Sequence, residues 1–221
     1  MNFTKNQIAQ MINHTILKAT ARSNNIIKLC EEAKQHNFYS VCVNPFYASL
    51  AAEKLQNSKV KVCVVVGFPL GASCVEIKAQ EAKKAVKDGA EEIDMVINIG
   101  ALKDGNYELV ENDIHMVAQA CKPAKLKVIL ETCYLSEEEI IKACKLVVKA
   151  GADFVKTSTG FGDYGAKEDH VKLMRKTVGT EFGVKASGGI SSSDDAIKMI
   201  KAGATRLGAS KGIKIISGFE K

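Results

Sequence analysis

The chain has 221 residues, of which 31 are basic and 25 acidic, so the formal charge is +6, and 46 % are hydrophobic. This is ordinary globular composition, and the longest apolar runs are far shorter than the roughly 18 residues of a membrane span. Only three basic residues are arginines and tryptophan is absent, so neither a membrane protein nor a nucleic-acid-binding surface is expected.

Short apolar runs rich in β-branched residues alternate with longer segments of helical periodicity along the whole chain. The expected strands are residues 12–17, 38–43, 61–67, 93–99, 126–131, 153–157, 182–186 and 205–207. The expected helices are residues 24–36, 73–88, 107–121, 136–149, 167–178 and 193–201, with a further helix after Ser210. Strands such as 61–67 are apolar on both faces, which is typical of a parallel sheet covered by helices.

Several helix ends carry recognisable capping residues. Ser136 precedes Glu139 by three residues and Ser193 precedes two aspartates, so we expect both serines to be N-caps. Gly89, Gly151 and Gly203 each stand between a helix and the next strand, where a glycine with positive φ ends a helix. This recurrence is a weak internal strand–helix repeat.

Eight strand–helix units without an intervening linker predict a single α/β domain over residues 1–221, a (β/α)₈ TIM barrel. A doubly wound open sheet is the alternative, because periodicity cannot show whether a sheet closes. In a barrel the chemistry lies at the C-terminal ends of the strands and in the loops that follow. Residues 1–5 lack the apolar segment of a signal peptide, so we expect a soluble, cytoplasmic protein.

The cysteines and histidines form no recognisable metal or triad pattern. The seven cysteines include no C-x-x-C pair and none near a histidine at zinc-ligand spacing, so we interpret them as small core residues, one of them near a site. The four histidines are scattered. No dinucleotide or P-loop motif is present either, so the candidate chemistry lies elsewhere.

Two lysines interrupt apolar strands. Lys156 and Lys185 each stand at the C-terminal end of an expected strand and precede small residues and glycine. In neighbouring strands their ammonium groups can face each other, and a like charge together with burial lowers the pKa of an amine. The pattern predicts a Schiff-base lysine. Alternatively, both lysines form buried ion pairs or point outward between strand and helix.

Asp94 is an acidic residue inside the apolar strand 93–99. A carboxylate there can pair with one of the lysines and move a proton during carbon–carbon chemistry. The alternative is a salt-bridge partner with no catalytic part. Asn44 and Asn98 also lie at strand ends, where asparagine either lines a pocket or forms a turn.

Glycine-rich loops follow three of the strands. Gly188 and Gly189 end the seventh strand, and Gly208 and Ser210 lie between the eighth strand and the last helix. Loops at these positions of a barrel often form a phosphate cradle from backbone amides and a helix N-terminus. We also expect residues 67–71, Gly-Phe-Pro-Leu-Gly, to form a tight turn that shapes the pocket.

Two segments resemble the deoxyribose-phosphate aldolases: residues 154–162, Phe-Val-Lys-Thr-Ser-Thr-Gly-Phe-Gly, and residues 184–190, Val-Lys-Ala-Ser-Gly-Gly-Ile. The resemblance covers nearly the whole chain. Further segments that carry it are residues 12–18, 41–45, 67–71, 92–98, 130–132 and 206–210. It implies a class I aldolase on a (β/α)₈ barrel, which reversibly cleaves 2-deoxy-D-ribose 5-phosphate to acetaldehyde and D-glyceraldehyde 3-phosphate.

The resemblance also implies roles for individual residues. Lys156 is then the Schiff-base nucleophile, Lys185 the neighbour that lowers its pKa and joins proton transfer, and Asp94 a proton donor and acceptor. The residues that match substrate- and phosphate-binding positions are Thr159, Gly160, Gly188, Gly189, Gly208 and Ser210. The protonated imine is the electron sink, so no metal or cofactor is expected, and the family suggests a homodimer or higher homo-oligomer.

The chain departs from its relatives at three places. Asn13 stands where many carry aspartate, Lys211 follows Ser210 where a second serine is common, and residues 219–221 lack the tyrosine of some C-terminal tails. Lys211 either adds a charge near the phosphate or points outward. Two other functions stay open at this point: a phosphosugar isomerase or epimerase without a lysine adduct, and a sensor or scaffold that binds a phosphorylated metabolite without turnover.

Overall fold

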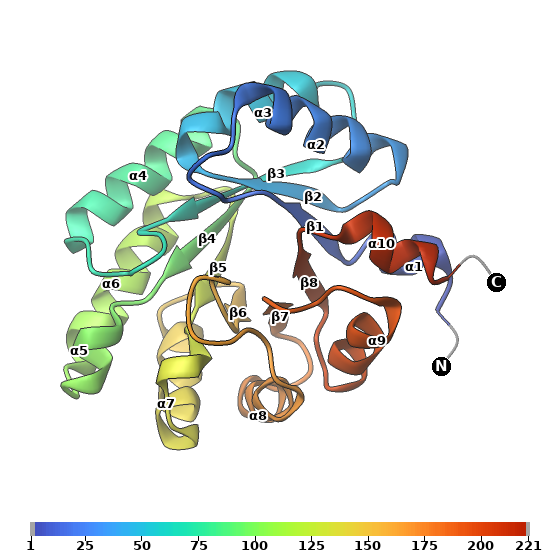
Figure 1. Cartoon of the computed structure of the whole chain (residues 1–221). Helices are drawn as coiled ribbons and strands as arrows, with labels where there is room; N and C mark the ends of the chain where they lie inside the picture. The colour runs from blue at the N-terminus through green and yellow to red at the C-terminus, as the bar shows by residue number, and fades with distance from the viewer. Residues whose placement is uncertain (1–2, 220–221) are drawn as a thin grey trace.

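The computed structural model describes residues 3–219, and its eight parallel strands close into a barrel (Figure 1). Each strand pairs with the next, and β8 pairs with β1, so that Gly208 lies beside Asn13. Closure confirms the (β/α)₈ prediction and excludes the open doubly wound sheet. The expectations about a signal segment and about the C-terminal tail partly concern residues 1, 2, 220 and 221, which lie outside the described residues.

All eight expected strands are present, most of them within one to three residues of the predicted ends. They are β1 Ile12–Thr15, β2 Ser40–Val43, β3 Lys61–Val66, β4 Glu92–Val96, β5 Lys125–Ile129, β6 Phe154–Lys156, β7 Gly183–Ser187 and β8 Arg206–Ala209. The six long helices also match: α2 Ser23–Gln35, α4 Val75–Lys87, α6 Tyr107–Ala120, α7 Glu137–Lys149, α8 Glu168–Val178 and α9 Ser193–Lys201.

Several short elements escaped sequence analysis because they have too few turns to show a period. They are α1 Lys5–Ala9, η1 Pro45–Tyr47, α3 Ala48–Lys54, α5 Ile99–Lys103 and η2 Thr132–Tyr134, whereas α10 Gly212–Ser217 is the helix expected after Ser210. The fourth strand was predicted too long. It ends at Val96 because the Asn98 side chain accepts a hydrogen bond from the Ala101 amide (3.0 Å) and starts a helix there.

The capping predictions were right for α7 and one residue off for α9. Ser136 caps α7 in a full capping box with Glu139, whereas Ser192, not Ser193, caps α9. The Ser192 hydroxyl accepts from the Asp195 amide, and the Asp195 carboxylate accepts from the Ser192 amide (3.0 Å). Gly89, Gly151 and Gly203 all have positive φ at helix ends, as predicted.

The main hydrophobic core lies between the strands and the surrounding helices. Because side chains alternate along a strand, the other face of each strand points into the barrel. There a small apolar cluster, with Cys42, Cys63 and Val65, lies beside buried charged side chains. Within residues 3–219 no helix has both the length and the apolar character needed to span a bilayer.

Candidate active site

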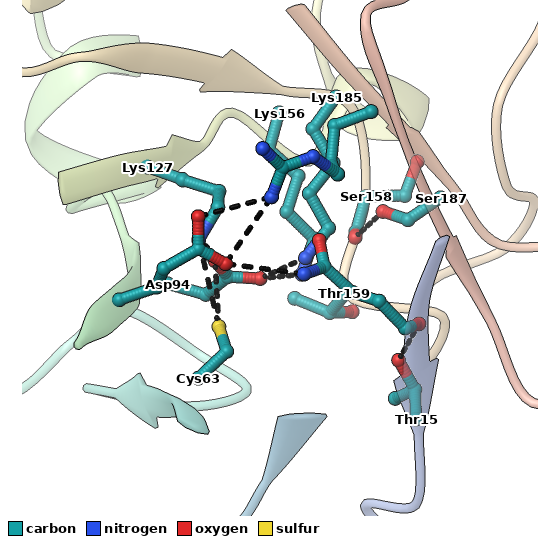
Figure 2. A network of polar contacts seen from close by, with 12 residues as sticks. Thr15, Cys63, Asp94, Lys127, Lys156, Ser158, Thr159, Lys185 and Ser187 are labelled. Atoms are coloured by element: carbon teal, nitrogen blue, oxygen red, sulfur yellow. Dashed lines mark hydrogen bonds and ion pairs between the residues drawn. The ribbon is translucent and has the colours of Figure 1, made fainter. Parts of the chain in front are cut away.

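Asp94 on β4 is the centre of a buried ion network inside the barrel (Figure 2). Its Oδ2 atom accepts hydrogen bonds from the Nζ atoms of Lys156 on β6 and Lys185 on β7, each at 2.7 Å. Its Oδ1 atom lies 3.2 Å from Nζ of Lys127 on β5 and accepts from the Cys63 thiol on β3, also at 3.2 Å. The three residues singled out from the sequence therefore meet at one carboxylate oxygen.

The surrounding ammonium groups govern the protonation of Asp94. Burial alone raises the pKa of a carboxylic acid, but Lys127, Lys156 and Lys185 overcome it and hold the pKa of Asp94 well below its usual value. Asp94 is therefore ionised in the resting site.

The same carboxylate reverses one expectation about Lys156. The sequence predicted a lowered pKa, from burial and the facing lysine. Burial does act in that direction, but the Coulombic attraction and hydrogen bond of Asp94 outweigh it and raise the pKa of Lys156. The prediction was wrong because it placed the two lysines against each other, whereas the structure places an anion between them.

Lys127 is a member of the network that sequence analysis missed. Its Nζ bridges Asp94 and Glu92 (2.9 Å to Glu92), and Glu92 also accepts from Arg206 at 3.0 Å. These contacts hold the pKa of Glu92 below its usual value despite burial. The signal was the alternation of Lys127 with apolar Leu126 and Val128, which marks it as an inward-facing residue.

The network also bears on metal binding. The Sγ atoms of Cys42 and Cys63 and a carboxylate oxygen of Asp94 lie within 4.8 Å of one another, which suits a thiophilic cation by distance. Both oxygens of Asp94 are, however, in contact with ammonium groups. A cation would have to displace them, so this donor set does not fit a resident metal.

Five of the seven cysteines are buried as predicted; Cys74 is exposed and Cys133 half-buried.

A cavity of about 420 Å³ opens above Lys156 at the C-terminal ends of β6, β7, β8 and β1. It contains every predicted substrate- and phosphate-binding residue. The lining residues are Thr15, Ile16, Leu17, Lys18, Lys156, Thr159, Gly160, Phe161, Ser187, Gly188, Gly189, Ile190, Gly208, Ala209 and Ser210. Lys185 and Asp94 lie deeper, fully buried, so Lys156 is the lysine of the pair whose side chain reaches the cavity.

Glycines at the cavity are required by close contacts. A Cβ at position 208 would lie 3.0 Å from Cε of Lys185 and 2.9 Å from Cβ of Ser187, so Gly208 leaves the space in which Lys185 extends toward Asp94. Gly188 has a φ of +83° and approaches Gly165 so closely that a Cβ on Gly165 would lie 2.2 Å from the carbonyl carbon of Gly188. The backbone at the rim therefore has its shape only with glycine at these positions.

Polar side chains fasten the ends of β6 and β7 to each other and to β5. Ser187 donates from its hydroxyl to the Ser158 carbonyl (2.6 Å), and the Thr157 hydroxyl donates to the Ser187 carbonyl (3.1 Å). Glu131, a buried residue with a positive φ of +55°, accepts from the Thr159 amide (3.2 Å) and hydroxyl. Glu131 lay in a segment that carried the resemblance, but no sequence signal indicated this role.

Other residues considered from the sequence lie outside the cavity. Asn13 is buried and donates to Glu92 (3.1 Å) and Ser40. Lys211 lines a neighbouring cavity, and Asn44 donates to the Leu17 carbonyl at 3.3 Å. Residues 67–71 form the predicted tight turn, closed by the Gly71 amide and the Gly67 carbonyl (2.7 Å), but do not line the cavity.

Comparison with known proteins places this site in a family. The family described as DeoC/LacD family aldolase matches residues 7–218. The chain belongs to this family. It is 59 % identical over 216 residues to the deoxyribose-phosphate aldolase of Aciduliprofundum boonei, covering 97 % of both chains. It is 60 % identical over 217 residues to that of Carboxydothermus hydrogenoformans, covering 96 % of this chain and 95 % of the relative.

The comparison with solved structures agrees with this family assignment. The tetrameric deoxyribose phosphate aldolase from Aeropyrum pernix superposes with a TM-score of 0.92 at 31 % identity, covering 99 % of this chain and 93 % of that one. The DeoC aldolase family confirms the resemblance drawn from the motifs, and the chain is an aldolase, a lyase that works through a lysine Schiff base. The isomerase and sensor alternatives lose their support.

Proposed function

We propose that the chain acts as one barrel domain that reversibly cleaves 2-deoxy-D-ribose 5-phosphate to acetaldehyde and D-glyceraldehyde 3-phosphate, in the breakdown of deoxyribose phosphates. The observation that carries the proposal is the position of Lys156. Its side chain lines the cavity while its Nζ lies 2.7 Å from the buried Asp94 carboxylate. One amine thus has access both to a substrate carbonyl and to a proton acceptor.

In the proposed reaction, the neutral Lys156 amine adds to C1 of the open-chain sugar and forms a carbinolamine. Loss of water gives an iminium ion, and loss of the proton from the 3-hydroxyl breaks the C2–C3 bond. D-Glyceraldehyde 3-phosphate leaves, and the bond electrons form an enamine on Lys156. Protonation at C2 and addition of water then release acetaldehyde and the free amine. The iminium nitrogen accepts the electrons of the broken bond, which is the function of a Schiff base.

Asp94 and Lys185 are the proposed proton carriers. Asp94 takes up and returns protons during the reaction at its Oδ2 atom, which both lysines contact. Lys185, which does not line the cavity, keeps a positive charge beside the new iminium and can return a proton through Asp94. Once Lys156 becomes an iminium, that carboxylate still has a cation on either side.

The phosphate group is proposed to lie in the loops after β6, β7 and β8. Gly188 and Gly189 both have positive φ, and Thr159, Gly160, Gly208 and Ser210 line the same cavity. Left-handed glycines turn successive backbone amides toward one side, which suits an anion. In this proposal the phosphate lies at the rim of the cavity and the aldehyde carbon near Lys156.

Trapping with borohydride tests the nucleophile. Incubation with acetaldehyde and borohydride should add one ethyl group to Lys156, as measured by intact mass and peptide mapping. Lys156→Ala should lose the adduct and reduce turnover by about 10⁴-fold or more, as loss of a nucleophile does. Lys185→Leu should keep the adduct but slow turnover by about 10²-fold, the usual contribution of a proton-transfer group.

A matched control is Lys172→Ala, which removes an exposed lysine of α8 and should change neither mass labelling nor turnover. An unlabelled wild-type chain, or a label that persists in Lys156→Ala, would remove Lys156 as nucleophile. Labelling of Lys185 in the wild type would exchange the two roles.

We also propose that the chain forms a homodimer or a higher homo-oligomer and works in the cytoplasm with small phosphosugar and aldehyde substrates. The Aeropyrum pernix relative is a tetramer, which supports self-association. The seven free cysteines suit a reducing compartment. Light scattering after size-exclusion chromatography measures the mass in solution, and a monomer at micromolar concentration would contradict the proposed assembly.

A further inference from the structure

The cavity at Lys156 offers few positive charges to a phosphate group. Among the described residues that line it, only Lys18 and Lys156 are basic and none is acidic. The Lys156 ammonium is already paired with Asp94 and, in the proposed function, becomes the imine nitrogen. Lys18 is therefore the basic side chain that remains available to an anion.

The loops after β6, β7 and β8 contribute neutral groups. Gly188, Gly189, Gly208 and Ser210 can donate hydrogen bonds but carry no charge. The β6–α8 loop presents Phe161, an apolar side chain that is 55 % exposed. These loops can donate hydrogen bonds to a phosphate monoester dianion, but they offer no positive charge to pair with it.

The backbone at Lys18 is firmly held. Lys18 lies in the β1–α2 loop, where the Ala21 amide donates to the Lys18 carbonyl at 3.0 Å. The Leu17 carbonyl accepts from Nδ2 of Asn44 at 3.3 Å, and the Ala21 carbonyl accepts from the Tyr47 hydroxyl at 2.6 Å. These bonds fix the loop on both sides of Lys18 and give Asn44 and Tyr47 a structural function.

The side chain of Lys18 is free to bind. It is exposed and makes no hydrogen bond or ion pair with any side chain that the structure describes. Lys18 and Ser210 both line the Lys156 cavity and also the neighbouring cavity between β1, α2 and the β8–α10 loop. Lys18 therefore lies at the same junction of the two cavities as Ser210.

We infer that Lys18 is the charged partner of the substrate phosphate and determines the preference for phosphorylated over unphosphorylated sugars, an inference that rests on the proposed function. Lys28 and Lys211 lie nearby but line only the neighbouring cavity, and Lys28 is within 3.9 Å of Glu32. This assigns to the β1–α2 loop the charge that Lys211 was a sequence candidate to provide.

Steady-state kinetics of Lys18→Met with two substrates tests the inference. For 2-deoxyribose 5-phosphate we expect KM to rise by about tenfold or more with kcat nearly unchanged, the loss of one charge-assisted hydrogen bond. For unphosphorylated 2-deoxyribose we expect kcat/KM to stay within about twofold of the wild-type value, because this substrate has no phosphate for Lys18 to bind. Lys18→Arg should recover most of the lost affinity.

Lys28→Met and Lys211→Met are the matched controls, since each removes one nearby positive charge without changing the lining of the Lys156 cavity. The inference is overturned if Lys18→Met leaves KM for the phosphorylated sugar unchanged or lowers kcat/KM for both sugars equally. It is also overturned if either control variant raises KM for the phosphorylated sugar as much as Lys18→Met does. The proposed function is tested separately by the wild type: a chain that fails to cleave the phosphorylated sugar refutes that proposal, whereas an active wild type with an unaffected Lys18→Met refutes only this one.

Discussion

A single carboxylate organises the chemistry at the residue scale. Asp94 contacts three ammonium groups that come from β5, β6 and β7, and all four side chains are buried. Removing one partner of such a buried cluster leaves an uncompensated charge and destabilises the fold, whereas an exposed ion pair contributes little to stability. The two lysines that resemble each other in sequence differ in one respect: only Lys156 lines the cavity.

The raised pKa of Lys156 predicts how imine formation depends on pH. Because only the neutral amine attacks, trapping of acetaldehyde by borohydride should accelerate from about pH 6 to about pH 9, below the ordinary lysine pKa of about 10.4. In Asp94→Asn the anion that raises this pKa is absent, while burial still lowers it. The midpoint of the pH profile should therefore move to lower pH, whatever the maximal rate.

The measurement is the initial rate of adduct formation as a function of pH, followed by mass spectrometry. Glu53→Gln, an exposed change outside the barrel, is the control and should leave the midpoint in place. If the midpoint of the pH profile is unchanged or higher in Asp94→Asn, Asp94 does not set the protonation of Lys156.

At the scale of the elements, short side-chain contacts at strand and helix ends hold the site in shape. Thr157, Ser158 and Ser187 fasten β6 to β7, and Glu131 holds the loop that follows β6. Gly89, Gly151 and Gly203 have positive φ where α4, α7 and α9 end, so that the next strand begins within a few residues. Rigid strand ends keep the lysine ammonium groups in contact with the Asp94 carboxylate.

The N-terminus of α9 gives a direct test at this scale. Ser192→Ala should lower the free energy of unfolding by about 1 kcal/mol, because the Asp195 amide loses its side-chain acceptor. Ser193→Ala changes the neighbouring serine, which is the first helical residue and not the cap, and should change the free energy of unfolding by no more than a few tenths of a kcal/mol. Urea unfolding of both variants measures the difference, and a larger loss for Ser193→Ala would reverse the assignment.

At the scale of the whole molecule, closure of the barrel concentrates charge in its interior. The buried network joins four basic side chains, Lys127, Lys156, Lys185 and Arg206, to two carboxylates, Glu92 and Asp94. Six of the eight strands contribute to it once Cys63 on β3 is included, so the network and the barrel form together. An excess of positive charge in the interior also favours an anionic substrate.

The lowered pKa values of Asp94 and Glu92 predict acid sensitivity of the fold. A carboxylate with a depressed folded-state pKa stabilises the protein above the unfolded-state value of about 4, and this stability is lost as the pH falls further, because the unfolded chain then binds protons that the folded chain does not. The free energy of unfolding should therefore decrease steadily below about pH 4.

Urea unfolding between pH 2 and pH 7, values spanning about two units below and three above the ordinary carboxyl pKa, measures this slope. Asp94→Asn should be less stable at neutral pH, because its three lysines lose their anion, and should show a shallower slope in acid. Equal slopes in the variant and the wild type would assign the acid sensitivity to other groups.

The sequence by itself determined the eight strand–helix units, the glycine helix ends and the two strand-end lysines, because each is a pattern among residues close together in the chain. It also indicated the family through motifs spread along its length. Only the tertiary structure decided that the sheet closes, that Asp94 lies between Lys156 and Lys185, and that Lys127 joins them. It likewise showed that Lys18, not Lys211, lines the cavity. The sequence could not show these arrangements, because they join strands and loops that are far apart in the chain.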